Sequence, residues 1–317
     1  DENFLKTVSD YFVYRDNAKY IYEGMGNEYA SYSVFVDFKT QDRVQTRTNN
    51  GGTETVKVIE NNGGKLTMLF SREETYYRDS LMQEPSIGAE VLLQNPIRVG
   101  TALELADNRR RSISNIDVEI ETPVGKYLAI EVLTEAEEYK SYSYYAPDVG
   151  LIKTVFKAEE MEVTSTLSEI IENTPLTQTV NFYYPNKNAD GINVVSRQLS
   201  FNTNDETSTV FEQVAKQLIT EVYDKTSTES VMLNRLHLNT DTNIVNADLS
   251  AQFVEKINAG SGFESFILQS ITNTLGDYYG VDKVYITLDG APYASGHIQM
   301  QEGQAFTVDY KNVRQVR

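Results

Sequence analysis

The sequence predicts two domains, a mainly β N-terminal domain and an α+β C-terminal domain. The chain has 317 residues, which is more than a single hydrophobic core usually serves. Up to residue 171 its apolar segments alternate with polar residues with a period of two, and the first helical stripe follows only after residue 204. We therefore place a β-rich domain at residues 1–172, an α+β domain at 177–310 and a tail at 311–317.

The first domain is predicted to be one curved antiparallel sheet or a partial barrel of about eight to ten strands. Residues 1–12 are expected to form a short helix or an ordered arm, and residues 81–96, with Pro85 and Pro96, a connector. Strands are predicted at 18–24, 32–39, 53–60 and 65–73, as a pair within 113–135 and as a second pair between 139 and 171.

The tetrad Asn-Asn-Gly-Gly occurs twice, at residues 49–52 and 61–64. Asn-Gly supplies the positive φ angles that tight hairpin turns require. The flanking segments alternate, so the tetrads predict the turns of an antiparallel meander. A ligand-binding loop is the alternative reading.

The second domain is predicted to contain one small sheet with two helices on the same face. The helix within 205–224 has an apolar stripe and a capping box formed by Thr209 and Glu212. A second helix begins at Ser261, with Glu264 completing its capping box, and ends at Gly280. Strands are predicted at 179–185, 192–201, 232–239 and 242–251, and as a final pair around the Asp289-Gly290 turn.

Composition excludes several classes of function. There is no cysteine, so disulfides, thiolate catalysis and cysteine-bound metals are ruled out. The net charge of −18 disfavours nucleic acid as a partner, and the one dense basic run, Arg109–Arg111, is predicted to be an exposed turn. No apolar run is long enough to cross a bilayer. The chain starts at Asp1, and we expect that a targeting segment has been removed before it.

One segment resembles the start of a calcium loop. In the run NKNADG at 186–191, Asn186, Asn188 and Asp190 could present oxygen atoms to a cation. The twelfth position is Arg197, where a bidentate glutamate belongs, so a turn is favoured over a metal site.

No catalytic group or cofactor site is predicted. His237 and His297 are the only histidines, too few for a zinc site, and a packing role is predicted for His297. A hydrolase elbow and glycine-rich phosphate loops are absent from the sequence, and 46 acidic residues make chance carboxylate pairs uninformative.

Tyrosine is in surplus, with 21 residues that often come in pairs. Neighbours in a strand face opposite sides, so one of each pair could be exposed and offer contact area to a protein or glycan. Tyr144, Tyr183 and Tyr278 are the interaction candidates. The alternative is that they are half-buried strand residues.

The second half resembles the GerM domain of sporulation and spore germination, which is found in envelope lipoproteins. NFYYPNKNADGINVVSRQL, VFEQVAKQLI, TNIVNADLSAQFVEKINAGSGFESFILQSITNTL and VDKVYITLDGAPYASGHIQM follow the order of the family's segments over residues 177–309. Where the family often has a proline-rich stretch, this chain has DKTSTESVML. In the first half, PIRVGTALEL and YYAPDVGLIKTVF are similar to the half-barrel of lipoprotein carriers, although Asp148 replaces a usual glycine.

The resemblance implies a non-enzymatic protein outside the cytoplasm, lipid-anchored on the outer face of the membrane. Its expected role is that of a binding or scaffold protein in sporulation or germination, without a cofactor. The expected partners are an envelope protein or peptidoglycan, with assembly into a homo-oligomer implied by similarity to ring-building modules. An apolar-ligand carrier that uses the first domain and a wall-active hydrolase are the alternatives.

Overall fold

The computed structural model describes residues 6–223, 231–257 and 260–316, which belong to two compact units. The first unit comprises residues 1–76, 80–176 and 202–204, and the second comprises 77–79, 177–201 and 205–317. The predicted classes, mainly β followed by α+β, are confirmed.

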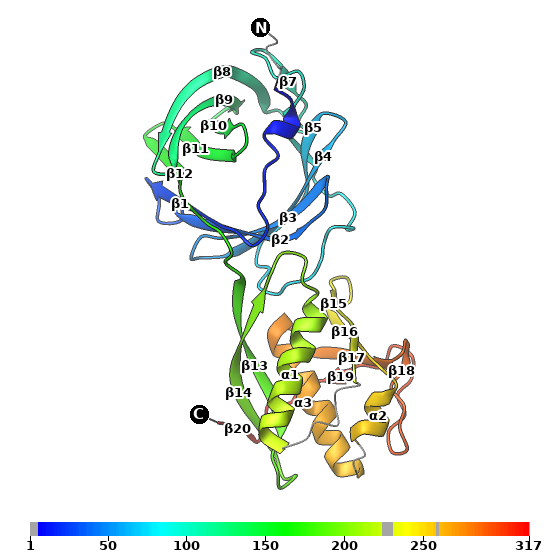
Figure 1. The fold of residues 1–317 in the computed structure, drawn as a ribbon. Helices are drawn as coiled ribbons and strands as arrows, with labels where there is room; N and C mark the ends of the chain where they lie inside the picture. The colour runs from blue at the N-terminus through cyan, green and yellow to red at the C-terminus, as the bar shows by residue number, and fades with distance from the viewer. Residues whose placement is uncertain (1–5, 224–230, 258–259, 317) are drawn as a thin grey trace. The chain divides into compact units, whose positions relative to one another are not determined.

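The first unit is built on one antiparallel sheet of twelve strands in the order β6-β5-β4-β3-β2-β1-β12-β11-β10-β9-β8-β7. Figure 1 shows that these strands curve round until the sheet is nearly closed. Strands pair with their neighbours in sequence except where β1 joins β12, so most of the sheet follows from consecutive hairpins. The strands are β1 (Lys19–Met25), β2 (Tyr32–Lys39), β3 (Arg43–Asn49), β4 (Glu54–Asn62), β5 (Lys65–Arg72), β6 (Glu90–Gln94), β7 (Ala102–Leu103), β8 (Arg110–Thr122), β9 (Gly125–Glu135), β10 (Tyr139–Ala146), β11 (Gly150–Ala158) and β12 (Met161–Ile171).

The chain's own N-terminal segment packs against the interior of this sheet. A 3₁₀ helix, η1 (Val8–Asp10), comes first, and in Figure 1 the segment that follows runs between the curved strands. Val8 and Tyr11 are buried in the same core as Ile113 and Leu167. The backbone N–H of Val8 donates to Asn95 Oδ1 at 3.0 Å, and the N–H of Asp148 donates to the carbonyl of Asp10 at 2.8 Å.

Both Asn-Asn-Gly-Gly tetrads form hairpin turns, as predicted. The first joins β3 to β4 and the second joins β4 to β5. Gly51, Gly63 and Gly64 have φ angles of 82°, 59° and 75°, a region that glycine enters without steric cost. The Asn50 side chain accepts the N–H groups of Gly52 and Thr53, so the first turn closes on itself.

Arginine side chains join the two end strands of the sheet, β6 and β7, and the adjoining part of β8. Arg111 donates to the carbonyl of Val91 at 2.9 Å and lies 2.5 Å from the Glu90 carboxylate, which Arg109 also contacts at 3.1 Å. Gln94 donates to the carbonyl of Ala102 at 2.7 Å. The prediction of an exposed turn at Arg109–Arg111 was therefore wrong, because two of the three side chains bind across the gap between the end strands.

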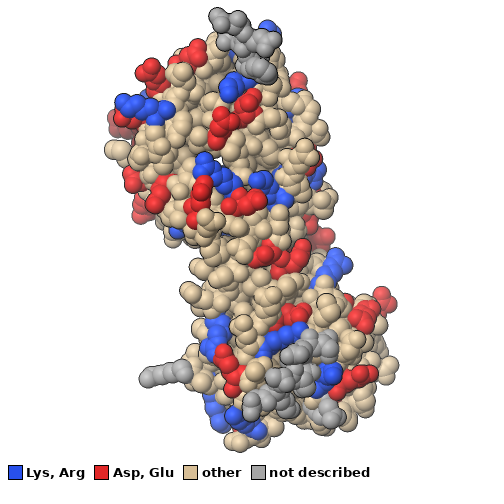
Figure 2. All heavy atoms as spheres, viewed as in Figure 1, with Lys and Arg blue, Asp and Glu red and all other residues tan. Residues whose placement is uncertain are grey.

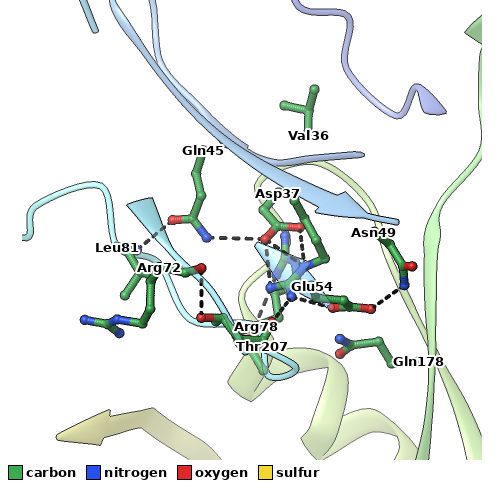
Figure 3. Close-up of polar contacts among 12 residues, drawn as sticks. Val36, Asp37, Gln45, Asn49, Glu54, Arg72, Arg78, Leu81, Gln178 and Thr207 are labelled. Carbon is green, nitrogen blue, oxygen red and sulfur yellow. Dashed lines mark hydrogen bonds and ion pairs between the residues drawn. The ribbon is translucent and has the colours of Figure 1, made fainter. Parts of the chain in front are cut away.

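A buried ion cluster lies on β2, β3 and β4 of the first unit (Figure 3). Arg47 is bound by the carboxylates of Asp37 at 3.0 Å and Glu54 at 2.8 Å. Burial alone would lower the pKa of Arg47, but the two carboxylates outweigh it and raise the pKa. Gln45 donates to Asp37 and Asn49 donates to Glu54, which gives both carboxylates further donors. The charges are thus paired and hydrogen-bonded, as burial requires.

The second unit contains two small sheets with helices packed against them. Helices α1 and α3 contact the five-stranded sheet β15-β16-β17-β18 with β19, and α1 also contacts β14 of the three-stranded sheet β13-β14-β20 (Figure 1). The strands are β13 (Leu176–Pro185), β14 (Ile192–Phe201), β15 (Leu233–Asn239), β16 (Ile244–Leu249), β17 (Lys283–Leu288), β18 (Ala291–Pro292), β19 (Phe306–Thr307) and β20 (Val313–Gln315). The helices are α1 (Thr207–Tyr223), α2 (Gln252–Ile257) and α3 (Ser261–Tyr279).

Two details of the second unit and one of the first differ from expectation. The strands divide into two sheets instead of one, because alternation identifies the buried face of a strand but not its partners. Residues 311–317 were predicted as a tail, yet β20 pairs in parallel with β14. Residues 81–96, predicted as a connector, contain β6, which pairs with β5.

Both predicted capping boxes are wrong, and the predicted C-cap is confirmed. Helix α1 begins at Thr207, so Thr209 lies inside it, and α3 begins at Ser261 after Gly260, with no side-chain cap. Gly280 ends α3 in the left-handed region at φ 68°. Residues 1–5 of the predicted arm and 224–230 of the segment that departs from the family lie outside the described residues.

We predict that Glu90→Gln loosens the closure of the first sheet. Loss of the charge weakens contacts to Arg109 and Arg111, and hydrogen bonds to charged groups contribute about 2 kcal/mol each. Hydrogen exchange of the full chain should show faster exchange of backbone amides in β6 and β7. Arg110→Ala is the matched control, because its side chain is 84% exposed and 3.9 Å from Glu135. Equal exchange in the two variants would contradict the assignment.

Candidate functional site

Helix α3 holds the segment that follows residue 305 through polar side chains. The buried Asn273 donates to the carbonyl of Asp309 at 2.6 Å and accepts its N–H at 2.9 Å. Gln269 donates to the carbonyl of Thr307 at 3.0 Å. These amides satisfy backbone groups that would otherwise lack partners, and so fix the course of residues 307–309 along the helix.

Gly276 allows this segment to approach α3 closely. A Cβ atom at this position would lie 2.3 Å from Val308 Cγ1 and 2.8 Å from the carbonyl oxygen of Val281. Both distances are below van der Waals contact, so a larger residue would displace the segment. A glycine inside a helical pattern is the one local sequence signal of this contact.

The close approach places Tyr310 beside Tyr183, one of the predicted interaction residues. The two ring centroids are 5.5 Å apart and the rings are inclined by 47°. Tyr310 is 44% exposed and Tyr183 is half-buried, so the pair offers aromatic area at the surface. We call Tyr183 and Tyr310 the tyrosine pair.

Polar groups surround the tyrosine pair. Asn181 donates to the Asp277 carboxylate at 2.9 Å and accepts from the Ser196 hydroxyl at 2.8 Å. Burial and then the carboxylate of Asp277 raise the pKa of Tyr183 to about 12. Both hydroxyls therefore stay protonated at neutral pH, since burial and Asp277 also raise the pKa of Tyr310. The site can therefore stack on a partner and donate hydrogen bonds.

The other two interaction candidates lie elsewhere. Tyr278 donates to Gln178 Oε1 at 2.7 Å, accepts the N–H of Arg78 at 2.9 Å and packs on Phe211. Its side chain therefore stabilises contacts within the second unit. Tyr144 is half-buried on β10, where burial and then Glu131 raise its pKa. Their role in binding stays a prediction.

The calcium-loop candidate is a turn closed by its own side chains. Asn186 is buried, donates to Asp190 Oδ1 at 2.5 Å and accepts the Asp190 N–H at 3.1 Å. Two of the three candidate ligands, Asn186 and Asp190, are thus hydrogen-bonded to each other, and a cation would have to break these bonds. Asn188 lies in the same turn and is exposed. Among the described residues there is no group of three or more His, Asp or Glu that could hold a metal ion.

The two histidines do not meet. His237 is half-buried on β15, where burial and then Arg235 lower its pKa, so the ring is neutral at pH 7. His297 was predicted to pack against the last hairpin, but it is exposed. Figure 2 shows acidic and basic side chains interspersed over the visible face, without a single-sign stripe among the described residues there.

Asp248, in the family-like segment NADLS, holds the Asp289-Gly290 turn. Its Oδ1 accepts from Thr287 Oγ1 at 2.6 Å and from the Gly290 N–H at 2.8 Å, and its Oδ2 accepts from Asn234 at 3.1 Å. Burial opposes ionisation, but the hydrogen bonds from Thr287, Gly290 and Asn234 outweigh it, so the pKa of Asp248 lies below its usual value. The carboxylate therefore serves the packing of the turn.

Comparison with known proteins supports the resemblance drawn from the sequence. The family model Germane, described as "Sporulation and spore germination", matches residues 181–294, so the GerM-like character of the second half is confirmed. A search of the curated proteins finds no match. None of the helices in the described part of the chain is long and apolar enough to span a membrane.

Two solved structures show distant similarity. One is a proposed exported protein with a YmcC-like fold from Bacteroides fragilis, at 12% identity over 51% of this chain and 99% of the other. The second is a proposed lipoprotein from Parabacteroides distasonis, at 15% identity over 51% of this chain and 98% of the other. Both have a TM-score of 0.32, and at that score they say nothing about what this chain does.

We predict that Asp248→Asn destabilises the second unit in a pH-dependent way. The amide replaces one acceptor oxygen with a donor, which should cost about 1–3 kcal/mol at pH 7. Because the pKa of Asp248 is depressed in the folded state, its stabilisation is complete above the unfolded value of about 3.9 and is lost as the pH falls through the folded value.

Urea unfolding at a series of pH values measures this difference. The gap between the native protein and Asp248→Asn should shrink in acid. Asp241→Asn, at an exposed position between β15 and β16, is the control and should change little. A gap that stays constant down to pH 2 would rule out the ionised carboxylate as the stabilising form.

Proposed function

We propose that the chain is a non-catalytic binding or scaffold protein of the bacterial cell envelope, acting outside the cytoplasm through its GerM-like unit. The family match at residues 181–294 carries this proposal, because that family is described by sporulation and spore germination. As the resemblance implies, a lipid attached at the N-terminal end of the exported chain would hold it at the outer face of the membrane.

The chemistry of the second unit supports a binding role over catalysis. Asp248 is bound to Thr287 and Gly290, and the buried Glu264 accepts from the Tyr293 hydroxyl at 2.7 Å. Both carboxylates are therefore engaged in contacts within the unit. A glycosidase requires two carboxylates on either side of the scissile bond.

The tyrosine pair is the proposed contact surface, and an envelope protein is the favoured partner. Half-exposed tyrosines provide rigid amphipathic area of the kind that dominates protein interfaces. The net charge of −18 would repel anionic wall polymers, which makes the wall itself the less favoured partner. A second copy of the chain is the other protein partner that the resemblance suggests.

The first unit gives little support to the carrier alternative. That hypothesis places an apolar ligand on the concave face of the sheet. Val8 and Tyr11 are buried in the core on the inner side of the sheet, together with side chains of the strands. A ligand there would have to displace the chain's own N-terminal segment.

Site-specific photo-crosslinking in host cells tests the proposed contact. A photoreactive residue at Tyr310 should give an adduct with one defined envelope protein or with a second copy, whereas one at the exposed Glu302 should not. With that partner purified, Tyr310→Ala should weaken binding about tenfold or more, the loss typical of an aromatic anchor. Equal adducts at both positions would argue against the tyrosine pair.

Compartment and catalysis need separate measurements. Protease added to intact protoplasts should digest the chain, and its survival there would overturn the extracytoplasmic assignment. Incubation of the purified chain with peptidoglycan should release no soluble fragments. Fragment release would favour the wall-active hydrolase, and sedimentation with the wall in the absence of crosslinks would make the wall the partner.

A further inference from the structure

The second unit contains an apolar cavity of about 240 Å³ that the proposed function does not use. It lies among β13, α1, α2 and α3. Aromatic and aliphatic side chains from these elements make up its walls, among them Phe182, Phe211, Leu218, Phe253, Phe263 and Ile267.

Three polar side chains on the cavity wall, those of Glu212, Thr274 and Ser270, are already bound to other groups. Glu212 accepts from Lys216 Nζ at 2.7 Å and from the Leu233 N–H at 2.8 Å. Thr274 accepts the Tyr183 N–H at 2.9 Å, and Ser270 donates to the carbonyl of Phe266 at 2.7 Å. A water molecule needs about two to four polar partners to settle in a buried site. The walls favour hydrocarbon over water.

The size of the cavity suits a hydrocarbon group. An engineered apolar cavity of about 150 Å³, lined by Leu, Ile and Phe, stays dry and binds benzene. This cavity is larger and has the same kind of lining. An occupant would therefore be an extended or branched alkyl group instead of a single small ring.

Two cations lie among the lining residues, Lys216 on α1 and Lys256 on α2. Lys216 is paired with Glu212, while the side chain of Lys256 belongs to an exposed residue at the end of a short helix. The Glu212–Lys216 pair carries no net charge, so among the described lining residues Lys256 supplies one excess positive charge. This charge would favour a ligand with a negative end.

We propose that this cavity binds the hydrocarbon chain of an anionic amphiphile, with the chain among the helices and the carboxylate or phosphate end near Lys256. Both a free fatty acid and a membrane lipid carry this chemistry. The inference rests on the cavity and its border, and it shares Tyr183 with the tyrosine pair because that residue also lines the cavity.

Calorimetry with decanoate and the full chain tests the proposal. The native protein should bind decanoate saturably with one site per chain. Ala215→Phe places a ring in the cavity and should weaken binding at least tenfold. Gln217→Phe, two residues away on the exposed side of α1, is the matched control and should bind as the native protein does.

Two further arms separate charge from hydrocarbon burial. Lys256→Glu should weaken decanoate binding severalfold and leave binding of decanol unchanged. Ile271→Phe fills the same cavity from α3 and replaces Ala215→Phe if that variant does not fold. Phosphatidylglycerol vesicles identify the source: sedimentation with them that Ala215→Phe abolishes indicates a lipid, and decanoate binding without sedimentation indicates a free acid.

Either of two results would overturn the proposal. The first is the absence of saturable decanoate binding to the folded native chain. The second is equal binding by the cavity-filled variants and Gln217→Phe, which would place the ligand elsewhere on the surface.

Discussion

The second unit depends on a helix that buries polar side chains, each of which must find a partner. In α3, Glu264, Asn273 and Thr274 are buried, and unpaired polar groups in such positions cost about 1–3 kcal/mol each. Each is satisfied by a different segment: the Tyr293 hydroxyl, the backbone of Asp309 and the N–H of Tyr183. These partners lie on β13, directly after β18, and between β19 and β20. Helix α3 therefore fixes the tyrosine pair and one wall of the cavity together.

The strands and their turns were the most predictable part of the fold, because the signals are local. The segment predicted at 32–39 matches β2 (Tyr32–Lys39), and Gly51, Gly63 and Gly64 of the two Asn-Asn-Gly-Gly tetrads have the expected positive φ angles. The closure of the first sheet was not predictable in this way. Arg111 finds Val91 and Glu90 about twenty positions earlier in the chain, and a basic run has the same local pattern whether it is solvated or paired.

The candidate site was only half predictable for a related reason. Tyr183 could be identified because it stands next to Tyr184 in a strand, where one of two neighbouring side chains can be exposed. Tyr310 stands alone in a segment without periodicity. Its position follows from Asn273, 36 residues before the clamped Asp309, and from the missing side chain at Gly276. The capping box predicted at Thr209 was wrong for a local reason. Helix α1 already begins at Thr207, whose hydroxyl donates to the carbonyl of Arg78, so Thr209 lies inside the helix.

The apolar interior of the first unit is filled by the chain's own N-terminal segment, whereas the second unit contains an apolar cavity. This difference decides where a ligand can bind. In the first unit the N-terminal segment packs against the inner face of the sheet, and hydrogen bonds from Val8 to Asn95 and from Asp148 to Asp10 hold it there. A ligand would have to break these bonds and displace Tyr11, losing burial that the chain already has. In the second unit the helices leave about 240 Å³ unfilled between Phe182, Phe211 and Phe263. An apolar occupant there gains contacts without breaking any, since atoms lining a void lack partners on one side.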